Sequence, residues 1–220
     1  MTIKAIVTGA TGMVGEGVLL ECLERPEVAE VLMVNRKPFD LRHPKLKVLI
    51  VPDFMELEDV ASRLSGYDAC FYCAGISSVG MTEAEYTHIT YDLTLHFAGV
   101  LAGLNPEMTF VFVSGGQTDS SEKGRIMWAR VKGKTENALM RVGFKQAYNF
   151  RPGFMKAMPG QRNVKSYYNL IGWLYPVLHV LTPNLVSTLS DVGLAMIKCV
   201  VEGYPKQVLE IKDINALAKV

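Results

Sequence analysis

The chain has 220 residues, of which 49% are apolar and 20% are charged, and its formal net charge is +1. This length and composition suit one large domain with a sizeable core, and the near-neutral charge gives no reason to expect a nucleic-acid partner. The sequence shows no signal peptide and no apolar run long enough to cross a bilayer, so we expect no membrane span and a cytoplasmic location.

Short apolar runs alternate with segments of helical periodicity over the first 150 residues. In chain order, the predicted elements are strand Ile3–Thr8, helix Gly12–Glu24, strand Val28–Val34, strand Leu46–Val51, helix Leu57–Leu64, strand Asp68–Cys73, helix Thr82–Leu104, strand Thr109–Ser114, helix Ile126–Val142 and strand Ala147–Arg151. The strands are apolar at successive positions, as in parallel strands covered on both faces. We therefore predict an α/β fold with a doubly wound parallel sheet, the Rossmann fold, as a single domain over residues 1–220.

The pattern weakens after the sixth strand. The predicted elements there are one or two helices over Lys165–Val180, a helix Asp191–Val201 capped by Ser190, and a last strand Gln207–Ile211. Ligands of doubly wound sheets bind outside the carboxyl ends of the strands. Residues 153–189 are therefore expected to form a small C-terminal cover on the substrate side.

A glycine-rich turn joins the first strand to the first helix, with the sequence TGATGMVG at residues 8–15. Its three glycines allow a tight turn, a close approach of the backbone to a pyrophosphate, and close packing of helix on strand. The helix N-terminus offers unpaired N–H groups and a favourable dipole to the phosphates. The predicted dinucleotide-binding residues of this turn are Gly9, Thr11, Gly12, Met13, Val14 and Gly15.

The end of the second strand indicates which dinucleotide is bound. A site for NAD favours a carboxylate there, to bond the ribose hydroxyls. The chain has Asn35, Arg36 and Lys37 instead. Arginine can hold a 2′-phosphate through two hydrogen bonds, so we predict NADP as the cofactor and NAD as the less favoured alternative.

TGATGMVG resembles the TGxxGxxG motif of extended and atypical short-chain dehydrogenases/reductases. Within that superfamily the chain is most similar to the epimerase-like NAD(P)-binding branch, which includes the Tat-interacting-oxidoreductase-like and NmrA-like proteins. Further matches to the cofactor-binding positions of the family are Asp53-Phe54, Ala74-Gly75, Val131-Lys132-Gly133-Lys134 with Glu136 in register, and Arg151-Pro152-Gly153. The resemblance implies that these segments contribute to the cofactor site, Lys132 among them.

The same resemblance implies a catalytic serine, a tyrosine and a lysine four residues after the tyrosine. Ser114 and Lys132 match the serine and the lysine, but Trp128 occupies the position of the tyrosine. An indole N–H can donate a hydrogen bond but cannot transfer a proton near neutral pH. Other candidate donors are Tyr86, His88 and Tyr91 at the start of the long helix, and Tyr167 and Tyr168 could line the substrate pocket.

Three functions remain open. The first is an NADP-dependent oxidoreductase or epimerase-like enzyme acting on a small carbonyl or alcohol; the second is a non-catalytic NADP(H) sensor; the third is a structural subunit. The resemblance also implies that the Thr82–Leu104 and Ile126–Val142 helices could form a homodimer seam. The apolar Trp173–Leu178 stretch could cover a hydrophobic substrate, touch a membrane surface, form a subunit contact or belong to the core. Cys70 and Cys73 lie three apart in a predicted strand and point to opposite faces, so no metal site is predicted.

Overall fold

The computed structural model describes residues 2–164, 175, 178, 181–182 and 185–219. Its main feature is a sheet of seven parallel strands in the order β3-β2-β1-β4-β5-β6-β9. The strands are β1 (Ile3–Thr8), β2 (Val28–Asn35), β3 (Leu46–Ile50), β4 (Ala69–Tyr72), β5 (Thr109–Val113), β6 (Gln146–Arg151) and β9 (Val208–Glu210). Strand order reverses between β1 and β4, which confirms the doubly wound Rossmann-type sheet.

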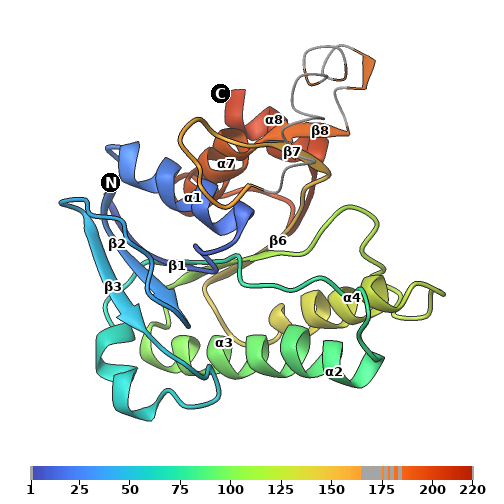
Figure 1. Ribbon diagram of the computed structural model, residues 1–220, viewed down its shortest axis with the longest axis horizontal. Coiled ribbons are helices and arrows are strands. Elements are labelled where there is room, and N and C mark those ends of the chain that lie inside the picture. The colour runs from blue at the N-terminus through green and yellow to red at the C-terminus, as the bar shows by residue number, and fades with distance from the viewer. Residues whose placement is uncertain (1, 165–174, 176–177, 179–180, 183–184, 220) are drawn as a thin grey trace.

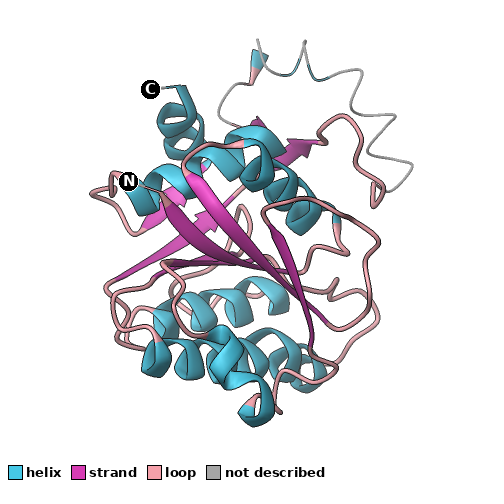
Figure 2. Ribbon diagram, turned by 90° about the vertical axis from the view of Figure 1, so that its left-hand side faces the viewer, coloured by secondary structure: helices cyan, strands magenta, loops and turns pink. Residues whose placement is uncertain are grey.

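Helices cover both faces of this sheet (Figures 1 and 2). One layer holds α1 (Met13–Glu24), α7 (Leu189–Val201) and α8 (Ile211–Lys219), and the other holds α2 (Glu83–Thr87), α3 (Leu93–Leu104) and α4 (Met127–Leu139). A π-helical turn, His88–Asp92, joins α2 to α3, and the short helix predicted near residue 60 is a 3₁₀ helix, Glu58–Leu64. The predicted Thr82–Glu85 capping box is present at the start of α2.

The two sheet faces explain why the strands are apolar at successive positions. Val7 and Phe71 belong to the core beneath α1 and α7, whereas Ile6 and Tyr72 belong to the core beneath α3. All four side chains are at most 2% exposed. Alternate residues of each strand are therefore buried on opposite sides, and neither face is left for solvent.

Glycines bring α1 and α7 unusually close together. A Cβ on Gly17 would lie 2.8 Å from the Cβ of Leu189, and one on Gly193 would lie 2.8 Å from the Cβ of Glu21. Helix α1 itself ends where Pro26 follows Arg25, since a proline cannot continue a helix. This packing fixes the N-terminus of α1 over the carboxyl edge of the sheet.

The C-terminal region differs from the sequence-based prediction in three respects. The cap of α7 is Thr188, whose hydroxyl accepts from the Asp191 N–H, and not Ser190, whose hydroxyl donates to Glu21 Oε2 at 2.7 Å. A two-stranded sheet of β7 (Phe154–Lys156) and β8 (Val186–Thr188) and the final helix α8 were not predicted. Tyr167, Tyr168 and most of the Trp173–Leu178 stretch lie outside the described residues.

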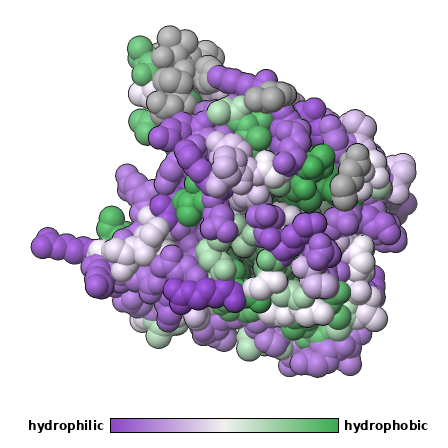
Figure 3. Space-filling view, turned by 180° about the vertical axis from the view of Figure 1, so that it is seen from behind, coloured by the Kyte–Doolittle hydropathy of each residue, from purple (hydrophilic) through white to green (hydrophobic). Residues whose placement is uncertain are grey.

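The surface seen from behind is mainly polar, with apolar residues in small groups (Figure 3). Among the described residues, no helix has both the length and the apolar content needed to cross a membrane. The four cysteines are free thiols, and the described part of the chain holds no cluster of three metal-binding side chains.

Candidate dinucleotide-binding site

Two adjoining cavities run along the carboxyl edge of the sheet. The first, of about 580 Å³, lies at the ends of β1, β2 and β4, and the second, of about 670 Å³, extends toward β5 and β6. Both are lined by Thr11, Gly12, Cys73, Gly75 and Ile76. The two cavities therefore form one continuous trough, with the glycine turn at its middle.

The backbone of the glycine turn fits a pyrophosphate. Gly9 has φ +71°, and a Cβ there would meet the Ala74 backbone nitrogen at 2.6 Å. A Cβ on Gly15 would lie 2.3 Å from the Gly9 carbonyl oxygen, so this glycine allows α1 to pack on β1. Gly12 instead lines both cavities, and no protein atom is closer than 3.4 Å to the position of its Cβ. The first helical N–H groups have no partner within the helix and are free to bind phosphate.

The end of β2 closes the first cavity. Asn35 is 2% exposed, and its Oδ1 accepts a hydrogen bond from the Ala10 N–H at 3.2 Å, so this side chain ties β2 to the glycine turn. Its Nδ2 is buried, with no hydrogen-bond partner among the described residues, and remains available to a ligand. The side chains of Arg36 and Lys37 are exposed and line the same cavity.

The remaining predicted adenosine-side residues gather in this cavity as well. Asp53, Phe54, Ala74 and Gly75 all contribute to its lining. Asp53 Oδ1 accepts from the Met55 N–H at 2.9 Å, which leaves its second carboxylate oxygen for a ligand. The orphaned Asn35 donor, the glycine cradle and this open carboxylate together suit the adenosine and pyrophosphate of a dinucleotide.

Lys132 lies in the second cavity, on α4. Its Nζ donates a hydrogen bond to the Ser114 carbonyl oxygen at the end of β5. Burial lowers the pKa of Lys132 to about 8, although the negative charge of Glu136 opposes the shift. A lysine that loses its proton near neutral pH can act both as a hydrogen-bond donor and in proton transfer.

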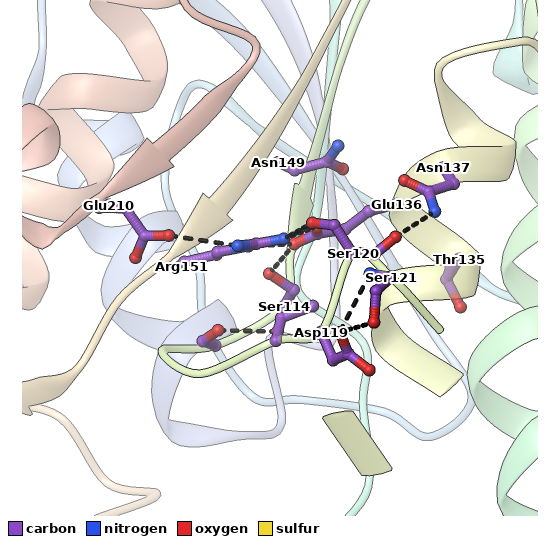
Figure 4. A network of polar contacts seen from close by, with 12 residues as sticks. Ser114, Asp119, Ser120, Ser121, Thr135, Glu136, Asn137, Asn149, Arg151 and Glu210 are labelled. Carbon is purple, nitrogen blue, oxygen red and sulfur yellow. Dashed lines mark hydrogen bonds and ion pairs between the residues drawn. The ribbon is translucent and has the colours of Figure 1, made fainter. Parts of the chain in front are cut away.

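Ser114 lines the same cavity, but its hydroxyl belongs to a buried network (Figure 4). The hydroxyl donates to Glu136 Oε1 at 2.5 Å, and the Glu136 carboxylate also receives Arg151 Nε at 3.0 Å and Nη2 at 2.5 Å. Arg151 Nη1 reaches Glu210 Oε1 at 3.2 Å. These side-chain bonds link α4 to the carboxyl ends of β5, β6 and β9 behind the cavity.

Some predicted site residues lie outside the trough. Arg151 is in the buried network and lines neither cavity, and a Cβ on Gly153 would meet Ile211 at 2.4 Å, which makes this glycine a packing position. Trp128 is half-buried in the first turn of α4 and also lines neither cavity. Pro152 and Met155 do line the second cavity.

The three alternative proton donors are dispersed. Tyr86 is 2% exposed in the core, and Tyr91 stacks under Lys134, whose Nζ lies 4.3 Å from the ring centroid. His88 lines the first cavity, at the ends of β1, β2 and β4, and its Nδ1 lies 3.3 Å from Asp92 Oδ2. None of the three lines the second cavity.

The sequence analysis did not single out Arg162 and Asn163, which lie within the expected cover of residues 153–189. Arg162 and Asn163 line the second cavity together with the glycine turn. Their backbone N–H groups donate to the carboxylate of Glu16 at 2.8 and 2.7 Å. The Pro159-Gly160 pair signals a turn in the sequence, but no local signal connects it with a glutamate 146 residues earlier.

Comparisons with known proteins agree with this geometry. Residues 5–123, more than half of the chain, match the family model described as the NAD dependent epimerase/dehydratase family. Solved structures with the same fold include the Bordetella bronchiseptica enzyme WbmF in complex with NAD⁺ (TM-score 0.67, 16% identity, 99% of this chain and 77% of that one). Another is uronate dehydrogenase from Agrobacterium tumefaciens (TM-score 0.65, 17% identity, 94% of this chain and 76% of that one).

Several relatives with detectable sequence similarity are fungal proteins. "Protein fmp52-2, mitochondrial" of Aspergillus terreus is 28% identical over 159 residues, which cover 69% of this chain and 66% of the relative. "Protein FMP52, mitochondrial" of Debaryomyces hansenii is 27% identical over 165 residues, covering 72% and 68%. The chain thus spans slightly less than two thirds of the length of the Aspergillus terreus relative.

These names correct one prediction. Because the sequence shows no signal peptide and no membrane span, we expected a cytoplasmic location; this expectation is wrong by the comparison, since these relatives are named mitochondrial proteins. The lack of a secretory signal does not distinguish the cytosol from the mitochondrion. The similarity to the short-chain dehydrogenase/reductase superfamily is confirmed, and the chain belongs to the NAD-dependent epimerase/dehydratase family.

Proposed function

We propose that the protein is an NADP-dependent oxidoreductase that acts on a small carbonyl or alcohol substrate. The observation that carries this proposal is the continuous trough, which leads from the glycine turn to Lys132 along one edge of the sheet. Arg36 and Lys37 in the first cavity favour a cofactor with a 2′-phosphate, since Asn35 occupies the usual place of the ribose-binding carboxylate.

Lys132 supplies the proton chemistry in this proposal. A bound nicotinamide would supply or accept the hydride. In the direction of reduction, the protonated Lys132 Nζ would give a proton to the carbonyl oxygen of the substrate, so that an N–H bond breaks and an O–H bond forms. The neutral amine would then regain a proton from solvent. The hydrogen bond to the Ser114 carbonyl holds Nζ in the cavity, and a pKa near 8 keeps the amine able to exchange protons.

The first test is a titration with NADPH, NADH and NADP⁺, followed by energy transfer from the two tryptophans of the chain to the reduced nicotinamide. We expect NADPH to bind more tightly than NADH, and Arg36→Ala to reduce that preference about tenfold or more. The matched control is Arg141→Ala, at an exposed position that lines neither cavity. Equal affinity for NADPH and NADH in the wild type would contradict the assignment of NADP.

The second test follows NADPH oxidation with a panel of small carbonyl compounds. Lys132→Met should abolish turnover, and the reduction rate of the wild type should fall as the pH rises through about 8, because reduction needs the protonated amine. A large gain of turnover in Trp128→Tyr would show that the wild type lacks its proton donor and would contradict the role of Lys132.

A second candidate function is a non-catalytic NADP(H) sensor. It is favoured by the hydroxyl of Ser114, which donates into the buried network, and by Trp128 at the position of the family tyrosine. A sensor must distinguish the two redox forms, since a ligand with equal affinity for two states shifts neither. Unequal binding of NADP⁺ and NADPH without any turnover supports the sensor, and equal binding excludes it.

We also infer a mitochondrial location, on the strength of the names of the fungal relatives. Fractionation of cells that express the full-length protein, with markers for cytosol and mitochondria, tests this inference. Recovery in the cytosolic fraction alone would contradict it.

A further inference from the structure

A buried carboxylate fixes one segment of the chain beside the glycine turn. Glu16 in the first turn of α1 is 2% exposed, and its two oxygens accept the consecutive backbone N–H groups of Arg162 and Asn163 at 2.8 and 2.7 Å. Burying a carboxylate is costly unless it is well hydrogen-bonded, and here backbone groups of another segment provide the bonds. Glu16 therefore sets the position of residues 158–163, which we call the strap.

A turn and two side-chain hydrogen bonds also hold the strap in place. Pro159 and Gly160, with φ +83° at the glycine, form a turn in which the Gln161 N–H faces the Met158 carbonyl at 3.4 Å. Gln161 Nε2 donates to the Met13 carbonyl at 2.7 Å, and Arg162 Nη1 donates to the Asp40 carbonyl at 2.9 Å. The strap thus spans the N-terminus of α1 and reaches the loop that follows β2.

Two donors of the strap remain available on the cavity side. Asn163 Nδ2 is buried and, within the part of the chain that the structure describes, has no hydrogen-bond partner. Arg162 is exposed, and only one of its guanidinium nitrogens has a hydrogen bond to a described residue. Both residues line the second cavity together with Thr11 and Gly12, whereas neither lines the first cavity with Arg36.

From this arrangement we propose that Arg162 and Asn163 bind the pyrophosphate of the dinucleotide together with the glycine turn, with Glu16 as the residue that positions them. The pyrophosphate carries two negative charges, and the glycine turn provides only N–H groups and a helix dipole to meet them. The guanidinium of Arg162 supplies a full positive charge, and Asn163 adds a neutral donor. The inference rests on the proposed function, since both require a bound dinucleotide.

Two fragments of the cofactor separate its phosphates in the test. ADP-ribose carries the pyrophosphate without a 2′-phosphate, and 2′-AMP carries the 2′-phosphate without a pyrophosphate. We expect Arg162→Ala to weaken ADP-ribose, NADH and NADPH alike by about tenfold or more, and Asn163→Ala by about threefold to tenfold. Binding of 2′-AMP should be unchanged in both variants and weakened only in Arg36→Ala. Calorimetry measures the fragments, and Arg141→Ala is again the matched control.

Limited proteolysis examines the strap directly. Trypsin cleaves after arginine, so the bond between Arg162 and Asn163 reports on access to the strap. In the wild type, ADP-ribose should slow this cleavage, as followed by mass spectrometry. Glu16→Gln removes the charge and one of the two acceptor oxygens, so cleavage should be faster and ADP-ribose binding weaker. Glu24→Gln, an exposed glutamate of the same helix, should behave as the wild type. Thermal melts establish that each variant is folded.

The outcomes are distinct. If Arg162→Ala and Asn163→Ala leave ADP-ribose binding unchanged, or if Arg162→Ala weakens only 2′-AMP and NADPH, the pyrophosphate assignment is wrong. If Glu16→Gln is folded and retains wild-type cleavage and affinity, Glu16 has no positioning role. If the wild-type protein binds none of the dinucleotides or ADP-ribose, the proposed function itself fails.

Discussion

The buried ion pair between Glu136 and Arg151 should contribute far more to stability than an ion pair of similar geometry on the surface. The side chain of Glu136 is 2% exposed and that of Arg151 is 10% exposed, with a closest contact of 2.5 Å. Removing one partner of such a pair leaves a buried charge uncompensated, which costs about 3–5 kcal/mol. In Glu136→Gln, only Glu210 remains to balance Arg151, from 3.2 Å and with its side chain 45% exposed.

A matched control is present in the same region. Glu83 pairs with Arg130 on α4 at 2.7 Å, but its side chain is 54% exposed. Exposed pairs contribute about 0–1 kcal/mol, so Glu83→Gln should change the free energy of unfolding by no more than that. The comparison holds the substitution and the partner type constant, and the two glutamates differ in burial and in the number of hydrogen bonds they accept, three for Glu136 and one for Glu83.

Equilibrium unfolding in urea measures both variants. For Glu136→Gln we expect the midpoint to fall by roughly 1 M or more, from a loss of about 3 kcal/mol and a slope of about 3 kcal/mol/M. The double variant Glu136→Leu/Arg151→Met should lose less than the sum of its single variants, because it leaves no unpaired charge. If the loss in Glu136→Gln is as small as in Glu83→Gln, the burial argument is refuted.

Three further predictions test packing and ionisation elsewhere. Gly15→Ala should lower the melting temperature strongly or prevent folding, because its Cβ would lie 2.3 Å from a backbone carbonyl oxygen. The control is Gly99→Ala in α3, where no atom lies within 4 Å of the added Cβ, and this variant should leave the melting temperature unchanged or raise it slightly. The lowered pKa of Lys132, about 8, means that this side chain binds more protons in the unfolded state than in the folded state between about pH 8 and 10.5. The stability of the wild type relative to that of Lys132→Met should therefore rise by up to about 3 kcal/mol over that range. Burial opposes ionisation of Asp213, but hydrogen bonds, chiefly from Lys206, hold its pKa below the usual value. Its contribution to stability should therefore be present above the pKa of an unfolded aspartate and lost as the pH falls through the native pKa. In Asp213→Asn, the urea midpoint should no longer show this loss at acid pH.

The parts of the site that depend on local sequence were predictable. The glycine turn is encoded by eight consecutive residues, and the strand before it and the helix after it have the expected bounds to within a residue. Lys132 was identified from the resemblance of Val131-Lys132-Gly133-Lys134, with Glu136 in register, to the family pattern, and the structure brings it to the same trough. Local geometry and fixed spacing therefore transfer from sequence to structure.

Contacts between distant segments were not predictable. The Ser114–Glu136 hydrogen bond joins residues 22 apart, and Glu16 meets its partners 146 and 147 residues later. In the sequence, Glu16 is an ordinary acidic residue of a first helical turn, where the dipole favours it anyway. The cap of α7 shows the same limit at short range: Ser190 and Thr188 both suit a cap, and only Thr188 has Asp191 three residues later to complete the capping box.

The two halves of the trough are held by different physical means. Backbone geometry forms the phosphate half, because Gly9 and Gly15 permit contacts that a side chain would block. Buried charges form the half that contains Lys132, because the Glu136–Arg151 pair fixes α4 behind it and the Glu136 charge partly offsets the burial of the amine. Loss of the ion pair should therefore disturb proton transfer before it disturbs binding of the adenosine end. Under the proposed function, affinity for ADP-ribose and the pH dependence of turnover should therefore report on separate parts of the same site, and a variant that kept the first and lost the second would match the proposed sensor with the same fold.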